Sequence, residues 1–157
     1  MLSEYLTARK RAQQQYDAAF YLLTVTFPTA KDPKLLMGVL YNIFSSLEST
    51  METILLYERE LHLVPAFHTS FRGKLTMFCS KSLKRNKIPP EMVTLMTHLN
   101  NILELHKKSP LEFQRDNRLI ICSNDYELTP ISLHNLREYL SKSKHFLEIA
   151  DKIIKMK

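Results

Sequence analysis

The residues best suited to chemistry are two carboxylates in an otherwise apolar stretch. Glu48 and Glu52 are four positions apart, and Tyr41 and Ser45 precede them at the same helical steps. In a helix these side chains lie on one side, and two carboxylates one turn apart repel each other unless a positive group approaches. The strip therefore predicts contact with a basic partner or a metal. The solvated face of an amphipathic helix has the same pattern and is the more common explanation.

A second group of candidate residues lies in a segment without helical periodicity. Arg115 and Arg118 stand three positions apart, and Tyr126 follows them. Arginine can bind a phosphate through two parallel hydrogen bonds, and aromatic rings stack on unpaired bases. The segment therefore predicts an anion or RNA contact. The same arginines can instead tie the loop to the rest of the protein through Asp116 or Asp125, because surface ion pairs of that kind are common.

The patterns of the familiar metal sites and enzymes are missing. No Glu is followed by a His three positions later, as di-iron helical bundles require, and the six His are scattered without zinc-ligand spacing. Neither a Gly-rich phosphate loop nor a nucleophile elbow is present. Cys79 and Cys122 are isolated, which favours free thiols in a reducing cytosol over a zinc site or a disulfide. We therefore expect no metal and no cofactor, and the familiar small-molecule enzyme classes are disfavoured.

Composition indicates a soluble globular protein. The chain has 157 residues, of which 45% are hydrophobic and 24% charged, and it contains two Gly, too few for a β-rich protein. Its formal net charge of +6 permits contact with nucleic acid without requiring it. The N-terminus does not resemble a signal peptide, and no apolar run is long enough to span a membrane. We expect a cytoplasmic protein.

Hydrophobic periodicity predicts about five helices. They are expected over Leu2–Phe27, from Asp32-Pro33 to before Pro65, from Thr69-Ser70 to about Lys87, from after Pro90 to before Pro110, and from Thr129-Pro130 or Ser132 to near the C-terminus. Pro28 is expected to end the first helix, because proline lacks the N–H that a continuing helix needs. The second helix is expected to be central, because its apolar positions form a wide, continuous stripe: Leu36, Leu40, Ile43, Leu47, Met51 and Ile54.

The connections between these helices are short, so neighbouring helices should run antiparallel. The sequence thus predicts an all-α, up-and-down bundle. A short irregular or extended segment is expected within 111–126, where Leu119-Ile120-Ile121-Cys122 is β-branched and turn residues follow. No repeat or flexible linker interrupts the chain, and one domain over 1–157 is expected.

In these features the chain resembles the HEPN family, which consists of small helical bundles found widely in archaea and bacteria. The resemblance is carried by Asp32-Pro33-Lys34-Leu35-Leu36 opening a helix, by Ser46-Leu47-Glu48 in its middle, and by Arg115 to Tyr126 preceding a closing helix that contains Phe146-Leu147. Members often lie beside nucleotidyltransferases in toxin–antitoxin pairs. The resemblance implies a helical bundle that works with RNA or with a protein partner.

The ribonucleases of that family carry an Arg, a spacer of four to six residues and then a His. Here no His follows Arg115 and Arg118 before His134, and Arg137 and His145 have seven residues between them. The resemblance therefore implies a non-catalytic interaction module, binding protein or RNA, and we expect it to be a homodimer because the wide apolar stripe leaves surface to bury. Two alternatives stay open: a ribonuclease with a displaced site using Arg137 and His145, and a structural subunit of a larger complex.

Overall fold

The structure confirms the all-α bundle. It is a computed structural model that describes residues 3–108, 111–115, 118–122 and 128–155; at 33, 111–115, 118, 119, 122, 128 and 129 it describes only the backbone. The described residues form five helical segments, as predicted. These are α1 (Glu4–Tyr21) continuing through the π-helical η1 (Leu22–Thr26) into α2 (Phe27–Ala30); α3 (Pro33–Glu60); α4 (Phe71–Met77) with the π-helical η2 (Phe78–Ser82) and α5 (Leu83–Arg85); α6 (Glu91–Lys108); and α7 (Leu133–Ile153).

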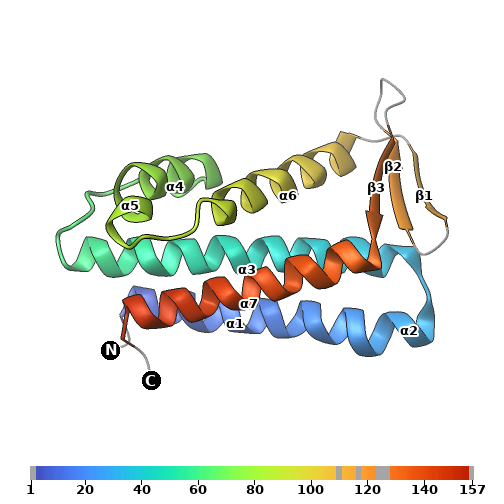
Figure 1. Cartoon of the computed structure of the whole chain (residues 1–157), viewed down its shortest axis with the longest axis horizontal. Coiled ribbons are helices and arrows are strands. Elements are labelled where there is room, and N and C mark those ends of the chain that lie inside the picture. The colour runs from blue at the N-terminus through green and yellow to red at the C-terminus, as the bar shows by residue number, and fades with distance from the viewer. Residues whose placement is uncertain (1–2, 109–110, 116–117, 123–127, 156–157) are drawn as a thin grey trace.

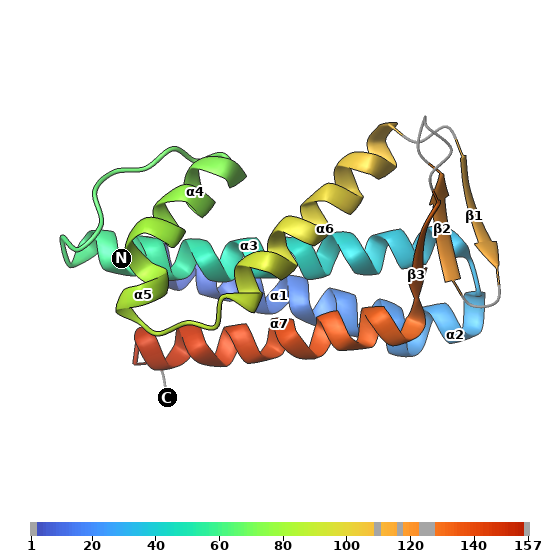
Figure 2. The same ribbon diagram turned by 45° about the horizontal axis from the view of Figure 1, so that its top comes forward.

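Helix α3 is the centre of the bundle, as expected. Figures 1 and 2 show α1, α3 and α7 side by side along the long axis, with α4, α5 and α6 covering another side of α3. All six residues of its predicted apolar stripe are completely buried. Successive long helices run in opposite directions, which is the predicted up-and-down order, and in both views α6 diverges from α3 toward its C-terminal end.

Three of the predicted helix starts are confirmed by side-chain caps. The Asp32 carboxylate accepts from the Lys34 N–H at 3.0 Å, and the Ser70 hydroxyl accepts from the Gly73 N–H at 3.1 Å. Ser132 caps α7 reciprocally with Asn135. Each cap satisfies amides that the first helical turn leaves without partners. The last helix starts after Ser132 rather than at Thr129, because the residues before it belong to a strand.

The prediction that Pro28 ends the first helix was wrong. The helix continues to Ala30, because η1 shifts the hydrogen-bond ladder just before the proline: the Phe27 N–H donates to the Leu22 carbonyl, five residues back. Pro28 then lies in the first turn after the shift, where a missing N–H costs little. The helix ends at Lys31, whose backbone is left-handed with φ of 54°.

The extended segment predicted within 111–126 is part of a small antiparallel sheet at one end of the bundle. Its strands are β1 (Leu111–Arg115), β2 (Arg118–Cys122) and β3 (Leu128–Ser132), in that order. Ile121 and Ile131 bury their side chains and fasten the sheet to the helical core. Figure 1 shows the sheet at the end opposite both termini. Helices among the described residues are too short or too polar to span a membrane.

Candidate functional site

The strip of polar residues predicted on the second helix lies on the outer face of α3. Tyr41 is 60% exposed, and Ser45, Glu48 and Glu52 are half-buried. Helix α1 borders this face on one side, and α4 and α6 border it on the other. Two pockets open along it, one in which five of the ten lining residues are charged and one mainly apolar. We call the whole feature the α3 groove, and its two parts the charged pocket and the apolar pocket.

The charged pocket has a volume of about 330 Å³ and lies between α1, α3 and the start of α4. Its lining residues are Glu4, Thr7, Ala8, Arg11, Glu52, Leu56, Arg59, Phe67, Thr69 and Lys74. Three cations from three separate elements therefore face one cavity, together with two carboxylates and two hydroxyls.

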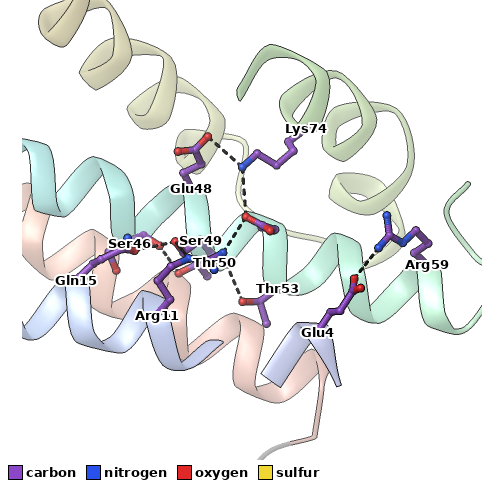
Figure 3. A network of polar contacts seen from close by, with 11 residues as sticks. Glu4, Arg11, Gln15, Ser46, Glu48, Ser49, Thr50, Thr53, Arg59 and Lys74 are labelled. Atoms are coloured by element: carbon purple, nitrogen blue, oxygen red, sulfur yellow. Dashed lines mark hydrogen bonds and ion pairs between the residues drawn. The ribbon is translucent and has the colours of Figure 1, made fainter. Parts of the chain in front are cut away.

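Lys74 supplies the positive group that the two carboxylates of the strip require. Its Nζ lies 3.1 Å from a Glu48 oxygen and 3.3 Å from a Glu52 oxygen, and Figure 3 shows Lys74 reaching toward Glu48. Arg11 adds a second cation, with Nη2 3.0 Å from the same Glu52 oxygen and Nε 3.3 Å from the Ser49 hydroxyl. The basic partner anticipated for the strip is thus present within the chain itself.

Lys74 reaches this position because the chain before it turns very tightly. A Cβ at Gly73 would lie 2.7 Å from the His68 Cβ and 2.9 Å from the His68 carbonyl oxygen, so glycine is required there. The first turn of α4 packs against α3, and the Lys74 side chain is left only 9% exposed. The sequence carried a signal for this burial, because Lys74 lies three residues after Phe71 and four before Phe78, and helical spacing puts the three on one face.

A second ion pair stands at the mouth of the charged pocket. Arg59 Nη2 lies 2.8 Å from a Glu4 oxygen, and the Arg59 guanidinium carbon lies 5.0 Å from the centre of the Phe67 ring. The Glu4 side chain is 74% exposed and Arg59 is 36% exposed. Ion pairs this exposed contribute little free energy, so the contact between Glu4 and Arg59 is easily exchanged for another.

The apolar pocket lies between α3 and α6, where the two helices diverge, and has a volume of about 380 Å³. It is lined by Met37, Gly38, Tyr41, Phe44, Ser45, Glu48, Asn100, Leu103, Glu104, His106 and Lys107. A Cβ at Gly38 would lie 3.6 Å from Leu22 Cδ1 of the first helix, which is an ordinary van der Waals contact. On the same helix Tyr21 and Val25 are 60% and 48% exposed.

The other predicted site residues lie elsewhere. Arg115 and Arg118 are directly paired in the register of β1 and β2, whereas Tyr126 falls outside the described residues. Arg137 and His145 are both exposed on α7. Eight residues of helix separate them by about 12 Å along the axis and about 80° around it, so the helix does not bring them together.

Burial raises the pKa values of three side chains among the described residues. Burial raises the pKa of the Cys79 thiol, which therefore stays protonated at neutral pH. Burial also raises the pKa of Tyr16, helped by Asp17 and Glu148, and the pKa of Tyr139. Within the described part of the chain, no three His, Cys, Asp or Glu residues gather closely enough to hold a metal ion.

Comparisons with known proteins add no relative. No protein-family model matches the chain, and neither a curated protein nor a solved structure matches it significantly.

Proposed function

We propose that this chain is a non-catalytic, HEPN-like interaction module that forms a homodimer through the apolar pocket of the α3 groove. The observation that carries the proposal is the 60% exposure of Tyr41 at a pocket with a mainly apolar lining. Exposed apolar residues gathered at a concave site are typical of protein contacts.

The charged pocket of the α3 groove supports binding rather than catalysis. Glu48, Glu52, Lys74 and Arg11 neutralise one another in short ion pairs, and such groups are poor acids or bases for a substrate. A protruding Tyr41 beside a pocket also suits a two-fold symmetric contact, because in such a dimer each copy offers both a projecting side chain and a hollow.

Replacing Tyr41 with Arg is expected to weaken dimerisation at least tenfold, because the change removes an aromatic contact and places one charge on each side of a symmetric interface. Leu61→Arg is the matched control, since Leu61 is 50% exposed but lies beyond the far end of α3. Light scattering coupled to gel filtration, over a range of micromolar concentrations, gives the mass of each variant.

The expected result is a dimer for the original chain and for Leu61→Arg, and a monomer for Tyr41→Arg. A monomeric original chain would exclude the homodimer. A dimer that resists Tyr41→Arg would place the interface on another face.

RNA binding is a second candidate function, favoured by the register of the sheet. Arg115 and Arg118 are directly opposed at the turn end of β1 and β2, and like charges in opposed positions destabilise a strand pair unless an anion neutralises them. In both views this end of the sheet lies beside the link between α2 and α3 and the first turn of α3, which carry the exposed Lys31 and Lys34. An RNA phosphate would supply such an anion.

The double variant Arg115→Gln and Arg118→Gln is expected to weaken binding of single-stranded RNA about tenfold and to reduce its salt dependence, because two phosphate contacts are lost. Native gels at two salt concentrations measure both. The double variant Lys144→Gln and Lys152→Gln removes the same charge from the exposed side of α7 and serves as control. Equal losses of RNA affinity in the two double variants would mean that only net charge matters. If the unmodified chain produces no gel shift of the RNA, RNA binding is excluded.

A further inference from the structure

The charged pocket holds donors that its internal ion pairs do not use. A guanidinium carries five N–H donors. Within the described residues, Arg59 directs one nitrogen to Glu4, and Arg11 directs two nitrogens to Ser49 and Glu52. Both guanidinium groups line the same cavity and are partly open to solvent. They can therefore accept an additional anion.

Lys74 is not available to bind an additional anion. Its charge is buried and lies against two carboxylates, and a buried charge deprived of its partners is costly. Glu52 is likewise held by both Lys74 and Arg11, and its side chain is 26% exposed. These groups form the fixed floor of the charged pocket, and they position Arg11 toward its opening.

Glu4 differs from Glu52 in being replaceable. It belongs to the first turn of α1, its side chain is 74% exposed, and Arg59 is its one ion-pair partner among the described residues. An exposed pair of this kind contributes little to stability. The carboxylate of Glu4 thus occupies the position on Arg59 that a carboxylate or phosphate from a ligand would take.

The remaining lining defines the rest of such a ligand. Leu56 and Phe67 supply apolar surface, and Thr7 and Thr69 supply hydroxyl groups. A volume of about 330 Å³ lies at the lower end of the range of small-molecule pockets, so the ligand must be small.

We infer that the charged pocket binds a small organic anion, whose phosphate or carboxylate group replaces Glu4 on Arg59 and approaches Arg11 while its apolar part lies against Leu56 and Phe67. This binding is independent of dimerisation, because it uses the charged pocket, whereas the proposed homodimer forms through the apolar pocket. Glu4 acts as an internal competitor that occupies the site until the ligand arrives.

Isothermal titration at constant ionic strength, with phenyl phosphate, phenylacetate and inorganic phosphate as probes, tests the inference. One of the two aromatic anions is expected to bind saturably at one site per chain, more tightly than inorganic phosphate, and the tighter one identifies the preferred anionic group. Arg59→Gln is expected to weaken that binding at least tenfold. Arg59→Lys, which keeps the charge but loses the planar fork, should give an intermediate affinity.

The decisive variant is Glu4→Gln, which removes the competing carboxylate and should tighten binding about two- to fivefold. Glu138→Gln removes a carboxylate from an exposed pair with Lys142 on α7, and it should leave the affinity unchanged. Unaltered or weaker binding in Glu4→Gln would overturn the inference. So would the absence of saturable binding by both aromatic anions, equal affinity for inorganic phosphate, or full affinity in Arg59→Gln.

Discussion

Replacing Lys74 with Met is expected to lower the free energy of unfolding by about 3 kcal/mol, because breaking a buried ion pair leaves charges without compensation. Methionine retains most of the apolar stem of Lys74 but no charge. Glu48 and Glu52 would then face each other one turn apart on α3, and only Glu52 would keep a cation, Arg11, within reach. Urea denaturation followed by circular dichroism measures the change.

The matched control is Lys142→Met, in which the lysine pairs with Glu138 four residues away on α7 and is 35% exposed. That change should shift stability by less than about 0.5 kcal/mol. Adding Glu48→Gln to Lys74→Met should restore about 1 kcal/mol or more, since it removes the unpaired carboxylate and leaves the contact between Glu52 and Arg11 intact. If Lys74→Met behaves like Lys142→Met, or if the added Glu48→Gln restores nothing, the ion pairs of Lys74 do not hold α4 against α3.

The sequence predicted the helices well because their signals are local. Asp32 and Ser70 cap the helices that they were expected to start, and the apolar stripe of α3 is buried along its whole length. The prediction for Pro28 failed because no local sequence pattern reveals the π-helical shift before it, in a segment that packs against α3. Strand β3 was not anticipated, because Pro130 within it argues against a strand and it occupies an edge of the sheet, where proline is tolerated.

Part of the candidate site could be predicted from the sequence, because that part depends on spacing along a single helix. The spacing of Tyr41, Ser45, Glu48 and Glu52 placed them on one face of one helix, and that face is the floor of the α3 groove. The walls could not be predicted, because Lys74 meets Glu52 from 22 positions away and Arg11 meets it from 41 positions away. Contacts over such separations depend on how helices pack, whereas periodicity reports only which side of each helix is apolar.

Glu58 is a second residue whose surroundings the local sequence pattern does not predict. It stands in the charged run Glu58-Arg59-Glu60 near the end of α3, which on sequence alone is typical of a solvated face. In the structure Glu58 is 2% exposed. Its carboxylate accepts from the Ser82 hydroxyl, from Arg85 Nη1 at 2.9 Å and from Asn86 Nδ2 at 3.1 Å. It therefore joins the end of α3 to the end of α5.

The same cluster also holds the chain where it leaves α3. The Leu63 N–H donates to the Glu58 carbonyl at 2.8 Å, and Arg85 Nη2 donates to the Leu63 carbonyl at 3.1 Å. Between them His62 has a left-handed backbone with φ of 61°, which these hydrogen bonds stabilise. Loss of the Glu58 carboxylate should therefore loosen the segment leading to α4 as well as the contact with α5.

Glu58→Ala is accordingly expected to cost about 3–5 kcal/mol of unfolding free energy, because it leaves three buried or half-buried donors without their acceptor and opens a cavity. Glu58→Gln preserves the shape and one acceptor, so its cost should be about half as large. Glu60→Ala, two positions along and exposed, is the control and should change stability by less than about 0.5 kcal/mol. Urea denaturation ranks the three variants, and limited proteolysis between α3 and α4 reports local opening. If Glu58→Ala and Glu60→Ala lower the free energy of unfolding by similar amounts, water replaces the Glu58 carboxylate as acceptor for the three donors without penalty. Apolar packing alone would then fix α5 against α3.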